Sequence, residues 1–263
     1  MDRLADAQRK SAAAMNLIKP ALGFALLIAV WQFAAPLAGI PAYVLPLPSS
    51  IAVRFAETFP VQLKGLSMTA FTTLAGLALA LICGVLLALL VIYVPMLRSL
   101  IMPLLAAFNS IPKIAVAPLF VIWFGLDYPS KILLAFLLAL FPIFVNSLTG
   151  LGEIEPDLID LSTLAGGTPW RIFLKVRLMH AVPYITDAMK VAFPLALVGS
   201  IVGEFIGGND GIGHLILSGQ FDIDTPLVFA ALLAITAFTT LGIGAIALFE
   251  NAFLKWRPSQ RRR

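Results

Sequence analysis

The sequence predicts an all-α membrane protein with about six transmembrane helices, and three observations support this fold class. Hydrophobic residues make up 60% of the 263 residues and charged residues 12%, whereas soluble domains contain about 25% charged residues. A soluble domain of this length could not bury so much apolar surface. The apolar residues also form long uncharged runs, and about 20 such residues are enough to cross the hydrocarbon core of a bilayer.

These runs define six predicted spans along the chain. They cover approximately residues 20–39, 66–94, 99–124, 132–150, 182–206 and 227–248. The third span contains Pro103, Pro112 and Pro118, and we expect it to kink or break because proline lacks a backbone donor. In the second span, glycine and alanine recur every four residues from Gly76 to Ala88. Small residues at this spacing favour close helix packing, either within one subunit or between two.

The distribution of lysine and arginine predicts that both termini are cytoplasmic. With that orientation, thirteen of these residues fall on the inner side and three on the outer side, a clear positive-inside bias. We therefore expect residues 1–19 to form a cytoplasmic arm, residues 20–254 a single transmembrane domain and residues 255–263 a basic cytoplasmic tail. The net charge of +4 comes largely from the two ends, where cations meet the anionic lipid bilayer. No nucleic-acid partner is expected.

The loop between the fourth and fifth spans, residues 151–181, is the most charged internal segment. Residues 153–177 hold 7 of the chain's 32 charged groups. Leucines at helical spacing predict a short amphipathic helix over residues 157–165. Gly166 and Gly167 are expected to end this helix, because glycine adopts the left-handed C-terminal conformation without a Cβ clash.

A second short helix is expected directly after the glycines. Thr168 suits an N-cap and Pro169 suits the first helical position, so this helix should run through Arg177. The predicted unit is a helix, a glycine turn and a second helix, lying at the cytoplasmic membrane surface.

The sequence lacks the usual patterns of catalytic residues. It has no GxxxxGK[ST] segment that would hold nucleotide phosphates. His180 and His214 lie on opposite predicted sides of the membrane, and neither has metal-ligand spacing to other residues. We expect no catalytic residue, no metal site and no cofactor bound by this chain.

Ionisable residues at membrane depth are costly and are therefore candidate functional groups. Lys113, in the segment NSIPKIAVAPL that begins at Asn109, comes about 14 residues into its span, or about 21 Å along a helix. Glu204 lies near the outer end of the fifth span. We predict that Asn109, Lys113 and Glu204 line a transport path; the alternative is that the charged groups brace the fold. Asp187 and Lys190 are predicted to form a structural pair.

The outer loop, residues 207–226, combines glycines with acidic residues. Its glycines between residues 207 and 213 predict tight turns rather than a helix. We predict that Asn209, Asp210, Asp222 and Asp224 form a docking surface for a soluble extracytoplasmic partner. A solvated loop that stays out of the lipid is the alternative.

Several segments resemble one family in the same order along the chain. The stretch from Asp160-Leu161-Ser162 through Gly166 to RIFLKVRLMHAVP resembles the EAA loop of the membrane subunits of ATP-binding cassette (ABC) importers. The chain departs from that pattern at Asp160, where Glu is usual, and at Leu161, where a small residue is usual. Within these importers, the nitrate, sulfonate and taurine permease group is similar at LPLPSSI (45–51), NSIPKIAVAPLFVIWFG (109–125), FPIFVN (141–146) and VGEFIGGNDGIGHLI (202–216).

The resemblance implies the permease subunit of an ATP-driven, binding-protein-dependent importer in the bacterial inner membrane. Separate ABC ATPase subunits, which bind ATP and magnesium, would contact the cytoplasmic loop at Asp160, Ser162, Gly166, Gly167 and Trp170. A soluble binding protein would deliver the solute to the outer face. Two identical permeases would pack around a central path.

The substrate class follows less directly from these residues. Lys113 near the path favours a small anion such as nitrate, a sulfonate, taurine or an aromatic carboxylate. A vitamin precursor or another neutral or cationic solute is the alternative within the importer class. An ion-coupled secondary transporter and a membrane scaffold are the alternatives from other classes.

Overall fold

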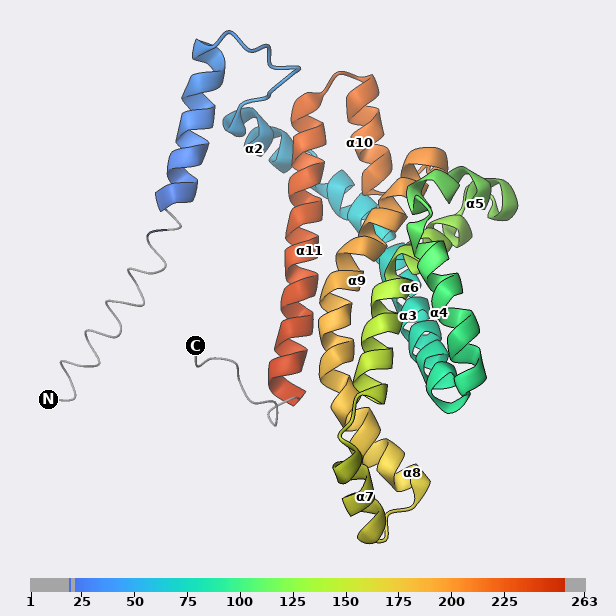
Figure 1. Ribbon diagram of the computed structural model, residues 1–263. Helices are drawn as coiled ribbons and strands as arrows, with labels where there is room; N and C mark the ends of the chain where they lie inside the picture. The colour runs from blue at the N-terminus through green and yellow to red at the C-terminus, as the bar shows by residue number, and fades with distance from the viewer. Residues whose placement is uncertain (1–18, 20–21, 254–263) are drawn as a thin grey trace, which may run out of the picture. The chain divides into compact units, whose positions relative to one another are not determined.

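The computed structural model describes Lys19 and residues 22–253, and these residues form helices and turns without a β-strand (Figure 1). The helices are Leu22–Leu37, α2 (Pro48–Glu57), α3 (Phe59–Tyr93), α4 (Pro95–Ser110), η1 (Lys113–Val116), α5 (Ala117–Phe124), α6 (Tyr128–Gly152), α7 (Pro156–Leu164), α8 (Pro169–Ile172), η2 (Phe173–Arg177), α9 (Leu178–Gly207), α10 (Ile212–Phe221) and α11 (Thr225–Phe253). The chain divides into two compact units, each described by itself. The first combines the described part of Met1–Phe59 with Ile216–Leu232, and the second combines Pro60–Leu215 with the described part of Leu233–Arg263.

The all-α membrane fold class is confirmed. Among the described residues, four helices are long and apolar enough to cross a membrane: Phe59–Tyr93, Tyr128–Gly152, Pro169–Gly207 and Thr225–Ala252. A bent pair of helices forms a fifth candidate span, and Leu22–Leu37 is a shorter apolar helix. Each of the six predicted spans thus contains an apolar helix. The arm and the tail lie outside the described residues apart from Lys19, and their cytoplasmic location stays a prediction.

The predicted break in the third span is confirmed. Helices Met96–Ser110 and Lys113–Phe124 meet at an angle of 84°. Ile111 between them is extended, with φ −69° and ψ 131°, because the following Pro112 disfavours the helical conformation of the residue before it. Pro103 lies inside α4 without ending it, and Pro118 lies in the first turn of α5, so the break is at Pro112.

The apolar core of the second unit lies where α3, α6 and α9 pack together. A Cβ on Gly76 of α3 would lie 2.5 Å from the Cβ of Ala135, and a Cβ on Gly199 of α9 would lie 2.6 Å from the carbonyl oxygen of Leu134. Both glycines therefore bring a helix closer to α6 than a side chain would allow. The small-residue spacing of the second span serves packing within one subunit, which is one of the two alternatives predicted for it.

The predicted pair of Asp187 and Lys190 is confirmed, and a third residue joins it. Lys190 Nζ lies 3.0 Å from Asp187 Oδ1 and also pairs with Glu250 of α11. This cluster connects α9 to the last turns of α11. Lys190 and Glu250 are 60 residues apart in sequence, so the spacing of Asp187 and Lys190 could not indicate this third partner.

The prediction that the outer loop contains turns without a helix is wrong. Residues 208–211 and 222–224 are not helical, and α10 (Ile212–Phe221) lies between these two turns. Gly211 carries the turn with φ +106°, a conformation that favours glycine. Gly213 lies inside α10 for a different reason: a Cβ there would lie 2.8 Å from Oε2 of Glu204. The small size of Gly213 permits its close contact with Glu204, whereas the sequence-based prediction assigned this glycine to a turn.

Candidate functional site

The loop between α6 and α9 forms a hairpin of the two short helices α7 and α8, which extends beyond the ends of α6 and α9 (Figure 1). Gly166 adopts φ +81°, and its amide donates to Thr163 O at 2.9 Å. The amide of Gly167 donates to Ser162 O at 2.9 Å, and a Cβ on Gly167 would lie 2.6 Å from that oxygen. These bonds satisfy carbonyl groups at the end of α7. The predicted helix and glycine turn are confirmed.

The second helix of the hairpin starts as predicted and continues further. Pro169 is its first residue, and the Thr168 hydroxyl accepts a hydrogen bond from the Arg171 amide at 3.4 Å. After α8 the chain makes one wide π-helical turn, η2, and enters α9 without a break. The expected end at Arg177 is therefore the end of the π-turn. The hairpin is joined to α9 through a continuous helix.

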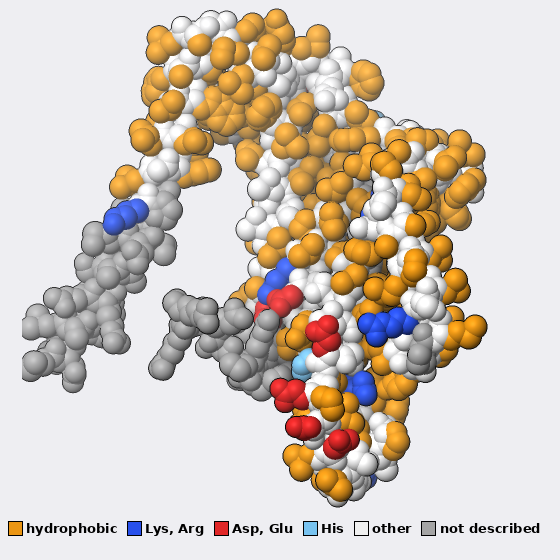
Figure 2. All heavy atoms as spheres, viewed as in Figure 1, with side chains coloured by type: hydrophobic (Ala, Val, Ile, Leu, Met, Phe, Trp, Pro, Cys, Tyr) orange, Lys and Arg blue, Asp and Glu red, His pale blue; other side chains and the backbone are white. Residues whose placement is uncertain are grey.

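The tip of the hairpin exposes large apolar side chains. Leu164 is 86% exposed, Trp170 68% and Leu161 64%, and the Trp170 ring stacks on Phe173 with 5.6 Å between the centroids. Figure 2 shows acidic side chains among apolar ones at the end of the molecule where Figure 1 places α7 and α8; the exposed Asp160 belongs to α7. Contiguous apolar side chains exposed at a surface are typical of sites that contact another protein or a membrane.

The candidate path residues occupy two separate sites. At the break between α4 and η1, Lys113 Nζ donates to Asn109 Oδ1 at 2.6 Å and to Asn109 O at 3.3 Å. The lysine therefore caps the C-terminal end of α4, where a cation is favourable. Asn109 and Lys113, four residues apart, are thus brought together. Neither of these residues bonds to Glu204, whose partners are different.

Glu204 of α9 is 1% exposed, and both of its carboxyl oxygens accept hydrogen bonds. Thr69 Oγ1 of α3 donates to Oε1 at 2.7 Å, and the Gly213 amide donates to Oε2 at 2.7 Å. Thr69 Oγ1 also accepts from the Ile212 amide at 2.9 Å. Glu204 and Thr69 together satisfy two free amides in the first turn of α10. Sequence reasoning missed Thr69, because nothing local relates it to a residue 135 positions away.

Two of the predicted docking residues belong to the second unit. Asp210 pairs with Lys131 of α6 at 2.7 Å, and the lysine side chain is only 4% exposed. Asn209 and Asp210 line a pocket of about 160 Å³ together with Lys64 and His214. The lining of this pocket therefore includes a lysine, an amide, a carboxylate and an imidazole side chain.

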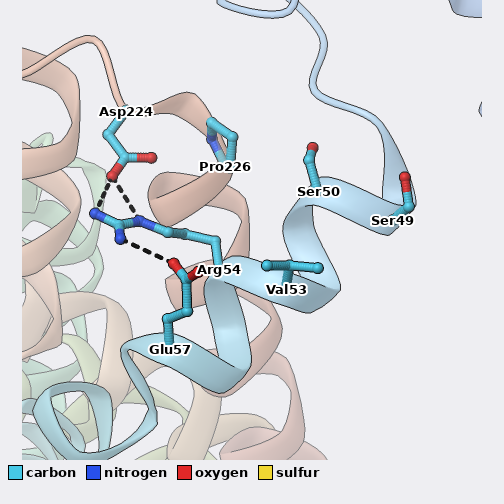
Figure 3. A pocket seen from close by; sticks show the side chains of 7 residues that line it. All are labelled: Ser49, Ser50, Val53, Arg54, Glu57, Asp224 and Pro226. Atoms are coloured by element: carbon cyan, nitrogen blue, oxygen red, sulfur yellow. Dashed lines mark hydrogen bonds and ion pairs between the residues drawn. The ribbon is translucent and has the colours of Figure 1, made fainter.

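The other two predicted docking residues belong to the first unit. Arg54 Nη2 lies 2.5 Å from Asp224 Oδ2, and Arg54 Nη1 lies 3.2 Å from Glu57 Oε2 (Figure 3). The hydrogen bonds to Asp224 and then to Glu57 raise the pKa of the Arg54 guanidinium, so it stays charged. A groove of about 400 Å³ runs beside these residues, and its lining includes Ser49, Ser50, Val53 and Pro226. Asp222 is exposed.

The described residues contain no group of three or more His, Cys, Asp or Glu side chains that could hold a metal ion. The candidate surfaces are the hairpin of α7 and α8, the pocket beside Asp210 in the second unit and the groove beside Asp224 in the first.

Comparison with known proteins identifies the family. Residues 76–255 match the family described as binding-protein-dependent transport system inner membrane component. The chain is 34% identical to a formylaminopyrimidine transport permease protein of Halalkalibacterium halodurans, covering 92% of this chain and 97% of that protein. It is 35% identical to a riboflavin transport system permease protein of Chloroflexus aurantiacus, covering 91% and 92%. It is 30% identical to a putative aliphatic sulfonates transport permease protein of Bacillus subtilis, covering 89% and 86%.

The fold matches a solved transporter structure as well. An inward-facing form of the MetNI methionine ABC transporter superposes with a TM-score of 0.65 at 19% identity, covering 74% of this chain and 97% of that chain. The chain therefore belongs to the binding-protein-dependent transport system inner membrane components, the permease subunits of ABC importers, and is a multi-pass protein of the bacterial inner membrane.

Proposed function

We propose that the cytoplasmic hairpin is the surface on which a separate ABC ATPase subunit docks. The exposed apolar tip carries this proposal, because Leu164 and Trp170 are 86% and 68% exposed on a projection that the Gly166–Gly167 turn holds in one shape. Asp160, Ser162, Gly166, Gly167 and Trp170 form the contact. ATP and magnesium bind to the ATPase, and this chain carries no catalytic residue.

The hairpin is joined to the membrane helices in a way that suits mechanical coupling. Pro169–Gly207 is one continuous helix, so a displacement of the tip by the closing ATPases moves α9. Two copies of this chain enclose the path, and the movement switches the path between inward-open and outward-open states. The resemblance to importer permeases supports the use of two identical copies.

At the outer face, a soluble binding protein delivers the solute. Asn209 and Asp210 in one unit, and Asp222 and Asp224 in the other, contribute to its docking. Asp210 and Asp224 are held by Lys131 and Arg54 respectively, so their carboxylates are presented in fixed positions.

The proposed solute is a small anion such as nitrate, a sulfonate, taurine or an aromatic carboxylate. Lys113 places a cation at the break in the third span, with its ammonium group against Asn109. Asn109, Lys113 and Glu204 are the proposed path residues. The relatives are named for a formylaminopyrimidine, riboflavin and aliphatic sulfonates, so an uptake assay should include vitamin precursors beside the anions.

The test is affinity purification of the tagged chain from its own host in mild detergent, followed by identification of co-purifying proteins and an ATP hydrolysis assay. We expect a stoichiometric ATPase with the wild-type chain and none with Gly166→Pro, because proline cannot adopt the φ of +81°. Gly125→Pro is the matched control, since Gly125 has φ +82° outside the hairpin. Undiminished transport by the Gly166→Pro variant would refute the docking assignment.

A further inference from the structure

Side chains of η2 and α9 form hydrogen bonds with carbonyl groups in the last turn of α6. Arg177 Nη1 donates to Leu151 O at 3.2 Å, and His180 Nδ1 lies 2.7 Å from Gly150 O. A carbonyl oxygen only accepts, so Nδ1 of His180 carries the proton in this bond. The last carbonyl groups of a helix have no partner within it, and here two of them receive donors from another element. We call these two bonds the base clamp.

The packing of the two arms explains how the base clamp forms. A Cβ on Gly150 would lie 2.8 Å from Tyr184 Cβ and 2.9 Å from Ala181 Cα, so the glycine brings α6 and α9 into close contact. The π-turn η2 lies directly before α9, and the Leu178 amide bonds to Phe173 O five residues earlier. A π-turn contains one residue more than an α-turn. The side chains after η2 therefore point in directions rotated about the helix axis relative to those of an uninterrupted α-helix.

The two arms of the hairpin are connected to the membrane helices in different ways. On one side, α8, η2 and α9 form the continuous helix Pro169–Gly207. On the other side, residues 153–155 between α6 and α7 are not helical. A movement of the hairpin tip therefore reaches α9 through a helix, whereas it reaches α6 through a short irregular segment and through contacts at its base.

From this asymmetry we infer that Arg177 and His180 are positioning residues for coupling. They tie the start of α9 to the end of α6, so that a displacement of the hairpin moves both helices together. The inference rests on the proposed docking of the ATPase at the hairpin. Without the base clamp, the segment at residues 153–155 can bend, and α6 lags behind α9. ATP hydrolysis then continues while less solute is moved per cycle.

The experiment uses the complete transporter with its ATPase and binding protein, reconstituted in liposomes. Uptake per ATP hydrolysed is measured for Arg177→Ala, His180→Ala and the double variant. We expect the double variant to retain the ATPase and its hydrolysis rate while uptake per ATP falls about fivefold or more, the usual lower range of coupling between sites. Lys175→Ala is the matched control, since Lys175 is an exposed base in the same π-turn.

Conservative variants separate positioning from a general loss of structure. Arg177→Lys retains a donor for Leu151 O, and His180→Asn places an amide N–H near the position of Nδ1, so both should restore most of the uptake per ATP. An unchanged ratio in the double variant would overturn the inference. The inference would also be overturned if uptake and ATP hydrolysis fell together in the double variant and in both conservative variants. That result would indicate a structural role alone. Absence of an ATPase from the wild-type preparation is a different result: it refutes the proposed function itself and with it the basis of the coupling role.

Discussion

Replacing Glu204 should reveal how much the junction of α3, α9 and the first turn of α10 depends on a single buried side chain. Glu204→Ala removes the acceptor for the Gly213 amide and for the Thr69 hydroxyl, each now bonded at 2.7 Å. An unsatisfied buried donor costs about 1–3 kcal/mol, and the Gly213 amide lies in the first turn of α10, where the helix itself provides no acceptor. The Thr69 hydroxyl can turn to Gly65 O, 3.2 Å away, so its loss is smaller, about 0.5–1.5 kcal/mol.

The sum is a loss of about 1.5–4.5 kcal/mol in the free energy of unfolding. In a chain of this size about 1 kcal/mol corresponds to about 2–4 °C in the melting temperature, so Glu204→Ala should melt roughly 3–18 °C lower than the wild type. The assay is the melting temperature of the detergent-solubilised protein, followed by size-exclusion chromatography of the heated samples. Glu57→Ala is the control, because the Glu57 side chain is 57% exposed and exposed ion pairs contribute about 1 kcal/mol or less.

Glu204→Gln distinguishes the two functions predicted for this residue. The glutamine oxygen can accept from the Gly213 amide, while its NH2 group can donate to the Thr69 hydroxyl, so most of the stability should remain. If Glu204 only anchors α10, uptake by Glu204→Gln should match the wild type; if its charge lines the path, uptake should fall in a stable protein. A melting temperature for Glu204→Ala equal to that of the wild type would refute the hydrogen-bond argument.

Two further predictions concern packing and the path. Gly199→Ala should destabilise the protein by about 1–3 kcal/mol, because its Cβ would lie 2.6 Å from Leu134 O. Gly244→Ala is the control, since a Cβ there meets nothing within 4 Å; equal melting temperatures for the two variants would contradict the close contact. Lys113→Ala should lower uptake of an anion roughly tenfold or more, the equivalent of one hydrogen bond to a charged group, and Lys113→Arg should retain part of it. Wild-type uptake by Lys113→Ala would remove Lys113 from the path.

The elements that the sequence predicts well depend on residues close together in the chain. The hairpin is predicted by leucines at helical spacing, by Gly166, and by Thr168 and Pro169. These residues lie close together in the sequence, and each affects the backbone of its immediate neighbours. The break at Pro112 is equally local, because a proline restricts the residue directly before it. The helix α10 was missed because Gly213 has a packing role that a glycine does not reveal in sequence.

The amino-acid sequence by itself therefore determined the membrane class, the approximate spans, the broken third span and the shape of the hairpin between α6 and α9. Each of these follows from hydropathy or from backbone preferences, which act over a few residues. Only the tertiary structure decided which charged and polar groups meet. Thr69 and Glu204 are separated by 135 residues, Lys131 and Asp210 by 79, and His180 and Gly150 by 30. A buried polar group takes whichever partner the packed helices bring within about 3 Å, and that choice depends on helix contacts that no local pattern encodes.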